Sequence, residues 1–151
     1  MQPHKKQPGE SRLQGTVGYA AGVWDLLHYG HISLLKRVRA QCDYLVVGVC
    51  TDSYTTSYKV TPFETEERRI HKIEGTGLAD KVVLVDHRHA LVYEKWGITH
   101  LFHGDDWERE QYIEHMDAQA IASHGIEVVL LAHTPGISST LLRSREVEAE
   151  L

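Results

Sequence analysis

Five short hydrophobic runs recur along the chain, and the stretches between them mix hydrophobic and polar residues in a different rhythm. The runs cover residues 16–23, 44–51, 81–86, 99–104 and 126–132. Each has the length of an ordinary β-strand. The run at 44–51 reads YLVVGVCT and is almost continuously hydrophobic and rich in valine, which predicts a strand buried on both faces. The chain therefore offers five candidate strands.

The segments between the runs predict helices. In 30–41, Ile32, Leu34, Leu35 and Val38 recur at helical spacing, with basic residues between them. Further helices are predicted at 64–74, 90–96, 108–124 and 138–150. Strands and helices that alternate at this spacing are joined by right-handed crossovers, and the strands pair in parallel. We therefore predict an α/β fold, a Rossmann-like three-layer domain with a five-stranded, mainly parallel sheet.

Composition narrows the class of protein. The chain has 151 residues, 42% hydrophobic and 25% charged, which is typical of one globular domain. Residues 1–14 are polar and basic, so we expect a flexible tail and no secretory signal, followed by one folded domain over 15–151. No hydrophobic run approaches the ~18–20 residues that a membrane helix needs. A net charge of −5 argues against nucleic-acid binding, and the two cysteines, Cys42 and Cys50, suit a reducing cytoplasm.

Polar groups follow the predicted strands. The junctions read GVWDLLHYGH, TDSYTTSYK, DHRH, GDDW and HTPGISST in chain order. A parallel sheet binds its ligand outside the carboxyl ends of its strands. Four of these five junctions carry groups suited to a phosphorylated ligand, so the candidate site lies at this edge of the sheet.

His28 and His31 stand where the first strand gives way to the first helix. Histidines three apart at a helix start lie on one face, and the helix amino terminus attracts anions. Gly30 between them leaves room for a phosphate to approach the backbone. The pair also fits two capping or surface histidines. A metal pair is the third alternative, but a third ligand at a characteristic spacing and an HExxH motif are both missing.

Taken together, GVWDLLHYGH resembles the (G)xFDxxHxGH signature of the nucleotidyltransferase superfamily that contains the cytidylyltransferases, with Trp24 in the usual Phe position. The segments GDDW at 104–107 and TPGISST at 134–140 resemble the GDDW and RTxGISTT motifs of the glycerol-3-phosphate cytidylyltransferases and their choline- and ethanolamine-phosphate relatives. The resemblance extends over about 17–143, and it implies a cytidylyltransferase-like nucleotidyltransferase domain over 15–151.

The resemblance implies a reaction in which a nucleoside triphosphate and a phosphomonoester give a nucleoside diphospho-compound and pyrophosphate. His28 and His31 would donate hydrogen bonds to the α-phosphate and the leaving group, while Lys59 and Arg68 would bind phosphates. Lys59 and Arg68 also fit solvated charged positions, and the alignment can slide to Arg69. Mg²⁺ is expected to arrive with the triphosphate, held by phosphate oxygens and water, with no protein ligand assigned.

The resemblance also implies a set of nucleotide-binding residues. They are Val23, Trp24, Asp25, Gly30, Asp105, Asp106, Trp107, His133, Thr134, Ile137, Ser138, Ser139 and Thr140. Asp25 equally fits a helix N-terminal acid, Trp107 a core tryptophan, and 138–140 a plain helix cap.

Two departures from the family pattern put the acceptor in doubt. His133 replaces the arginine of RTxGISTT, and Gly77 stands where relatives carry the arginine of an RYVDEV-like stretch. The favoured interpretation is a cytoplasmic, homodimeric enzyme that transfers CMP from CTP to a small phosphorylated alcohol, glycerol 3-phosphate first. One alternative is an adenylyltransferase acting on a sugar phosphate or FMN. The other is a catalytically silent nucleotide-binding module that regulates a partner.

Overall fold

The computed structural model describes residues 15–132, which form one parallel sheet flanked by helices. The strands are β1 Val17–Gly22, β2 Tyr44–Cys50, β3 Lys81–Val85, β4 His100–Gly104 and β5 Glu127–Leu131. The helices are α2 Tyr29–Arg39, α3 Asp52–Tyr58, α4 Glu66–Gly75, α5 His89–Trp96, α6 Arg109–His115 and α7 Ala118–Ser123. The strand order is β3-β2-β1-β4-β5, and all four pairings are parallel. The predicted Rossmann-like α/β fold is confirmed.

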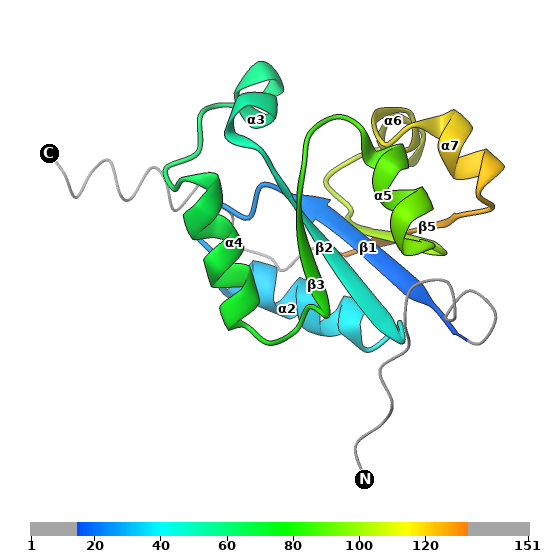
Figure 1. Cartoon of the computed structure of the whole chain (residues 1–151), viewed down its shortest axis with the longest axis horizontal. Coiled ribbons are helices and arrows are strands. Elements are labelled where there is room, and N and C mark those ends of the chain that lie inside the picture. The colour runs from blue at the N-terminus through cyan, green and yellow to red at the C-terminus, as the bar shows by residue number, and fades with distance from the viewer. Residues whose placement is uncertain (1–14, 133–151) are drawn as a thin grey trace, which may run out of the picture.

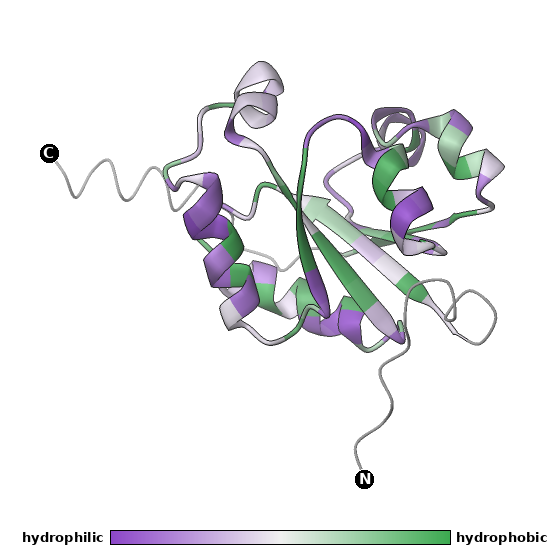
Figure 2. Cartoon of the chain, viewed as in Figure 1, coloured by the Kyte–Doolittle hydropathy of each residue, from purple (hydrophilic) through white to green (hydrophobic). Residues whose placement is uncertain are grey.

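The helices cover both faces of the sheet and make three layers. Figure 1 shows α2 and α4 on one face and α5, α6 and α7 on the other, with α3 beyond the end of β2. One hydrophobic cluster joins the sheet to α2 and α4 through Leu35, Val38 and Ile73, and a second joins it to α5–α7 through Tyr93 and Tyr112. In Figure 2 the strands between these layers are largely hydrophobic, and purple hydrophilic residues lie on α2, α4 and α5. Burial on both faces explains the continuous hydrophobic run of β2.

Two predicted elements differ from those observed. The polar segment at 52–58 is helix α3, which begins at Thr51, whose hydroxyl accepts a hydrogen bond from the Tyr54 amide at 3.1 Å. The single helix predicted over 108–124 is two helices, separated at Asp117, whose backbone has a φ of 79°. The predicted tail at 1–14 and helix at 138–150 lie outside the described residues.

The strand order places the candidate site. β1 lies between β2 and β4, so the chain leaves β1 toward one side of the sheet and reaches β4 on the other. In parallel sheets, ligands bind in the crevice at such a switch point, beyond the carboxyl ends of the strands. The segments after β1, β2 and β4 meet there. Within 15–132, no helix is long and hydrophobic enough to cross a membrane.

Candidate active site

The two histidines of the HYGH segment form the first turn of α2. His28 is the residue that precedes the helix, and its Nδ1 accepts a hydrogen bond from the Gly30 amide at 3.0 Å. Nδ1 of His31 accepts one from the His28 amide at 3.2 Å. The two imidazole rings stack, with their centroids 3.8 Å apart and their planes 20° apart. The structure thus brings the predicted catalytic pair together.

These hydrogen bonds fix the protonation state of both rings. A ring nitrogen that accepts an amide N–H carries no proton, so each neutral imidazole has its proton on Nε2. Burial lowers the pKa of His28. Burial, followed by the neighbouring His28, lowers the pKa of His31 to about 3. Two neutral, parallel rings therefore present Nε2–H donors at a helix amino terminus, where anions are favoured.

Trp24 and Asp25 support the loop that leads into this turn. The Trp24 ring is 6% exposed, packs in the core, donates from Nε1 to the Gly48 carbonyl at 2.9 Å and meets His31 edge-on. The two carboxylate oxygens of Asp25 accept the backbone amides of Phe63 and Glu64 at 2.9 and 3.0 Å. Asp25 therefore ties the segment before α4 to the loop after β1. Because the Trp24 ring is buried, we assign it a supporting role beneath His31.

Arg69 joins the loops that follow β1 and β2. It is fully buried, and its guanidinium donates to the carbonyls of Glu64, Val23 and Cys50 at 3.1, 2.7 and 3.0 Å. It also donates to Oδ1 of Asp52 at 2.5 Å. These hydrogen bonds connect α4 to the segments that follow β1 and β2, so we interpret Arg69 as a structural residue that holds these segments together.

Arg68 points the other way from the same helix. Its side chain is 67% exposed, and its Nε donates to Oε2 of Glu64 at 3.1 Å. Oε1 of Glu64 accepts the Leu26 amide at 2.8 Å, so Arg68 is held beside the loop that carries His28. Burial opposes ionisation of Glu64, but hydrogen bonds from Lys72, Leu26 and Arg68 outweigh it and lower its pKa. The position suits a cation that reaches a phosphate.

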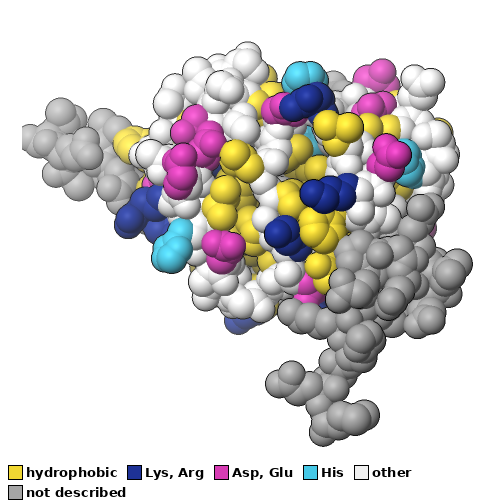
Figure 3. Space-filling model, viewed as in Figure 1, with side chains coloured by type: hydrophobic (Ala, Val, Ile, Leu, Met, Phe, Trp, Pro, Cys, Tyr) yellow, Lys and Arg dark blue, Asp and Glu magenta, His cyan; other side chains and the backbone are white. Residues whose placement is uncertain are grey.

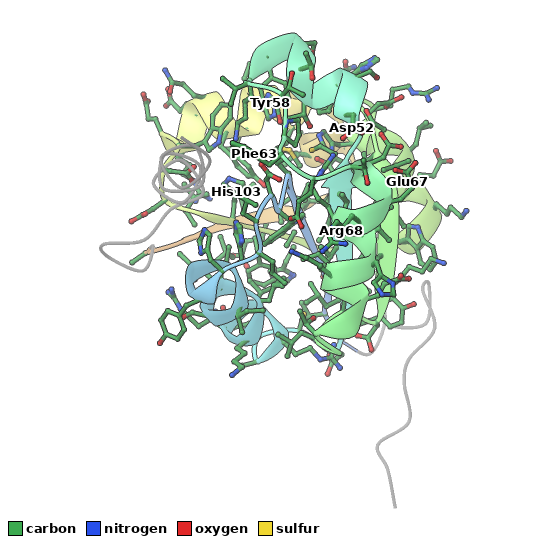
Figure 4. All side chains as sticks on the ribbon, turned by 90° about the vertical axis from the view of Figure 1, so that its left-hand side faces the viewer. Asp52, Tyr58, Phe63, Glu67, Arg68 and His103 are labelled. Atoms are coloured by element: carbon green, nitrogen blue, oxygen red, sulfur yellow. The ribbon has the colours of Figure 1, made fainter. Side chains whose placement is uncertain are left out.

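A pocket opens on the other side of the β1 terminus. We call it the aromatic pocket, and six of its lining residues are Tyr58, Lys59, His103, Trp107, Tyr112 and His115. Val23 and His89 line it as well, so it adjoins the loop that leads to the histidine pair. Figure 4 looks onto this edge of the molecule, with Tyr58 on α3 above, Arg68 on α4 below, and Phe63 and His103 between them.

Lys59 and the GDDW segment both lie at this pocket, although Lys59 comes after β2 and α3 in the chain and GDDW comes at the end of β4. Lys59 ends α3, and its ammonium lies 5.8 Å from the centroid of the Tyr58 ring. Trp107 stacks on His115 with centroids 4.6 Å apart. Oδ1 of Asp106 lies 3.5 Å from Nε2 of His103. Asp105 is exposed at the start of this turn.

Some residues considered from sequence lie elsewhere. His133, Thr134, Ile137, Ser138, Ser139 and Thr140 are outside the described residues. Gly77, with a φ of 69°, lies in the turn before β3, at the amino end of the strands and thus roughly 15 Å from the site edge. An arginine at position 77 would not reach the phosphates of its own subunit. Arg88 is paired with Asp86, its Nη2 lying 2.8 Å from Oδ2.

Sequence reasoning missed the partners that organise the site. Glu64 and Asp52 are ordinary acids in the sequence, and neither carries a signal that it accepts backbone amides or a buried arginine. Tyr112 carries no signal either, because it lies within a predicted helix. His89 belongs to His87-Arg88-His89, a segment whose sequence fits both an acceptor-side position and a solvated loop. The only available signal was that His89 follows a strand at the active edge of the sheet.

Comparisons with known proteins identify relatives of this chain. A family model described as cytidylyltransferase-like matches residues 19–145. The bifunctional protein HldE of Rhodopseudomonas palustris strain BisA53 is 32% identical over 140 residues, which cover 90% of this chain and 28% of that protein. The protein of the same name from Caulobacter vibrioides is 33% identical over 132 residues, covering 85% and 27%. The chain thus spans little more than a quarter of these relatives.

Two solved structures share the fold. The lipopolysaccharide core biosynthesis protein from Thermoplasma volcanium GSS1 gives a TM-score of 0.69 at 22% identity, covering 80% of this chain and 98% of that one. A pantoate-beta-alanine ligase from Francisella tularensis gives 0.55 at 12% identity, covering 96% and 77%. At these identities the likeness concerns the fold alone.

Proposed function

The chain belongs to the cytidylyltransferase-like family, and on that premise we propose that it is a nucleotidyltransferase that joins a nucleoside monophosphate to a phosphomonoester and releases pyrophosphate. The observation that carries the proposal is the stacked pair His28 and His31, whose Nδ1 atoms both accept backbone amides. Both Nε2–H groups are thereby fixed as donors before a substrate binds. Donors held in advance of the reaction stabilise developing charge at little reorganisation cost.

The proposed reaction is an in-line displacement. A phosphate oxygen of the acceptor forms a bond to the α-phosphorus, and the bond from that phosphorus to the bridging oxygen of pyrophosphate breaks. Negative charge grows on the α-phosphate oxygens and on the leaving group, where the Nε2–H groups of His28 and His31 would donate. Lys59 and Arg68 would supply fixed positive charge on either side of the pair.

Mg²⁺ would neutralise part of the triphosphate charge when it is bound. Residues 15–132 contain no group of three His, Cys, Asp or Glu side chains placed to hold a metal. A magnesium ion carried by phosphate oxygens and water needs no such cage. The donor set therefore fits an ion that arrives with the nucleotide.

We propose ATP as the nucleotide and a sugar phosphate as the acceptor. The curated relatives named HldE support adenylyl transfer to a sugar phosphate. The comparisons give no support to the expected preference for glycerol 3-phosphate. Cytidylyl transfer stays a second candidate, because GDDW at 104–107 and TPGISST at 134–140 resemble cytidylyltransferase motifs.

The test is pyrophosphate release with every pair from two panels. One panel is ATP, CTP, GTP and UTP with Mg²⁺, and the other is mannose 1-phosphate, glucose 1-phosphate, ribose 5-phosphate, glycerol 3-phosphate and choline phosphate. We expect release with ATP and at least one sugar phosphate, and loss of release on His31→Ala. Release with CTP alone would select the second candidate. Silence across both panels would overturn nucleotidyl transfer and favour the regulatory module.

We also propose a homodimer, as the family resemblance implies. Exposed hydrophobic side chains support it. Figure 3 shows such side chains next to basic ones on the face that carries β3 and α5, where Leu84 and Leu91 are 46% and 55% exposed. Sedimentation velocity gives the mass in solution, and a monomer at all concentrations would contradict the proposal.

A further inference from the structure

We propose that the aromatic pocket is the acceptor subsite, and that His89 and Tyr112 in its lining hydrogen-bond the hydroxyl groups of a sugar phosphate whose phosphate lies toward Lys59. This rests on the proposed function and deepens it, because it says which part of the molecule recognises the carbon skeleton. The inference comes from two buried polar atoms without a hydrogen-bond partner, from the tautomer of His89, and from the aromatic side chains that line the pocket.

Within residues 15–132, only two buried side-chain polar atoms have no hydrogen-bond partner: Nε2 of His89 and the hydroxyl of Tyr112. Both side chains are 1% exposed. They come from different helices, α5 and α6, yet both line the same pocket. Leaving a buried polar atom unpaired destabilises the folded protein, because the group has lost its hydrogen bonds to water. A polar ligand that reached both atoms from this pocket would remove that cost, and this is the basis of the proposal.

Tyr19 determines which kind of hydrogen bond His89 offers. The Tyr19 hydroxyl lies 3.0 Å from Nδ1 of His89, and Tyr19 is fully buried. Burial holds the pKa of Tyr19 well above its usual value, so the phenol keeps its proton. Because Nδ1 of His89 is the hydrogen-bond partner that the structure gives this hydroxyl, we infer that the phenol donates to Nδ1. Burial also lowers the pKa of His89 to about 4. His89 is then a neutral ring with its proton on Nε2, a buried donor without a partner in a residue that lines the pocket. Tyr19 is a positioning residue.

The rest of the pocket suits the uncharged skeleton of a sugar. The His103 and Tyr112 rings stack with centroids 4.8 Å apart, and Trp107 stacks on His115, which gives flat apolar surfaces. Burial lowers the pKa of His103, although the neighbouring Asp106 acts in the opposite direction, and burial together with Lys59 lowers the pKa of His115. These groups are therefore neutral at pH 7.5, and Lys59 supplies positive charge at the rim.

This arrangement selects hydroxyls over a quaternary ammonium. Aromatic rings alone also bind cations such as choline. An N–H donor from His89 has nothing to pair with on a trimethylammonium group, and the Lys59 ammonium repels it. We therefore expect sugar phosphates to be preferred over choline phosphate, and the preference to depend on the two unpartnered groups.

The experiment compares Tyr112→Phe with a matched control, Tyr93→Phe. Both tyrosines are buried, but the Tyr93 hydroxyl already donates to the Met116 carbonyl at 2.5 Å. Steady-state kinetics are measured for the nucleotide and for the sugar phosphate of the panel that wild type uses best. We expect Tyr112→Phe to raise the acceptor KM roughly 5-fold, the effect of one neutral hydrogen bond, with the nucleotide KM unchanged. Tyr93→Phe is expected to leave both KM values unchanged.

A second arm separates this proposal from the proposed function. Calorimetry measures the binding of mannose 1-phosphate, glucose 1-phosphate, ribose 5-phosphate and choline phosphate to wild type and Tyr112→Phe. Sugar-phosphate binding that weakens in Tyr112→Phe supports the subsite even if wild type releases no pyrophosphate, which counts against the reaction alone. Equal binding by the two proteins, no sugar-phosphate binding by wild type, or tighter binding of choline phosphate each overturns the subsite.

Discussion

His28 has a structural and a proposed catalytic role at one ring, and the two can be separated by substitution. Its Nδ1 caps α2, whereas its Nε2 carries the proposed phosphate donor. Asparagine is a good helix cap but has no group in the place of Nε2. His28→Asn is expected to keep the melting temperature within a few degrees while turnover falls by roughly 10²–10⁴. Thermal denaturation and single-turnover rates measure the two effects.

The control for this experiment lies between the two histidines. Tyr29 is 69% exposed, and the capping hydrogen bonds of α2 are made by the side chains of His28 and His31. Tyr29→Ala should leave both melting temperature and turnover unchanged. A His28→Asn enzyme that turned over normally would remove the pair from the proposed mechanism.

Arg68 and Arg69 are neighbours whose substitution should give opposite results. Arg69→Ala removes a buried guanidinium from three carbonyls and a carboxylate, so we expect a loss of several kcal/mol of stability. Arg68→Ala removes a largely exposed side chain and should leave folding intact while raising the nucleotide KM. Urea denaturation and steady-state kinetics distinguish the two variants. An Arg69→Ala protein of normal stability would show that this structural role of Arg69 is unnecessary.

The sequence predicts the histidine pair more securely than it predicts which of Arg68 and Arg69 faces the ligand. The HxGH spacing dictates that both rings lie on the first turn of a helix, because backbone geometry alone brings residues three apart together. The choice between Arg68 and Arg69 depends on tertiary contacts. Arg69 is buried because it donates to the carbonyls of Val23, which follows β1, and Cys50, which ends β2. Nothing local to Glu67-Arg68-Arg69 carries that information.

At the scale of elements, Gly48 in β2 leaves space for the side chain of Tyr19, which hydrogen-bonds His89. A Cβ added at Gly48 would lie 2.6 Å from the hydroxyl of Tyr19. Gly48→Ala should therefore displace Tyr19, cost roughly 1–3 kcal/mol of stability and raise the acceptor KM as Tyr112→Phe does. Chemical denaturation and steady-state kinetics measure both.

Gly75 is the matched glycine. It ends α4, and a Cβ there has no neighbour within 4 Å. Gly75→Ala is expected to leave the acceptor KM unchanged and to stabilise the protein by up to about 1 kcal/mol. If Gly48→Ala behaved in the same way, Tyr19 would not depend on the space over β2.

The elements that sequence patterns failed to predict have clear physical causes. α3 contains a single buried side chain, Thr55, so it has no hydrophobic periodicity to detect. α6 and α7 keep one hydrophobic face across their break, because both pack on the same side of the sheet. The break at Asp117 involves neither glycine nor proline. Its carboxylate caps α7 by accepting a hydrogen bond from the Ala120 amide at 3.1 Å. The sequence alone does not predict this turn, because an aspartate within a helical pattern does not have to act as a cap.

At the scale of the whole molecule, the strands were the most predictable feature. All five hydrophobic runs became strands, with ends within one residue of the prediction. Burial on both faces explains the signal of β1 and β2, whereas β3 and β5 keep exposed positions and are recognised by their length and hydrophobic composition. The strand order is β3-β2-β1-β4-β5. Right-handed crossovers give this order only if the chain, after β3, returns to the other side of β1 to form β4, and the sequence does not predict that reversal. The aromatic pocket depends on that reversal, since it brings His89 after β3 and Tyr112 after β4 to the same edge beside β1. Its lining therefore could not be predicted from segments taken singly.

Buried neutral histidines give the whole molecule an acid-sensitive stability. His31 and His89 have pKa values lowered by burial to about 3 and about 4, whereas an unfolded histidine titrates near ~6.5. Below pH 6.5 the unfolded chain binds protons that the folded chain refuses, so unfolding becomes easier as pH falls toward 4. His89 alone should contribute a loss of about 2 kcal/mol between pH 7.5 and pH 5. Urea denaturation at pH 7.5, 6 and 5 measures the slope.

Two substitutions decide whether buried histidines cause this slope. His89→Gln removes one titrating group from the core, so its stability should depend less steeply on pH than that of wild type, although it is lower at pH 7.5. His71 is exposed on α4, and His71→Gln should reproduce the wild-type slope. The lowered pKa of Glu64 acts in the same direction, but only as pH falls through and below its ordinary range near ~4.3. A loss of stability that begins near pH 6.5 therefore belongs to histidines, whereas equal slopes in His89→Gln and His71→Gln would assign it to groups other than His89.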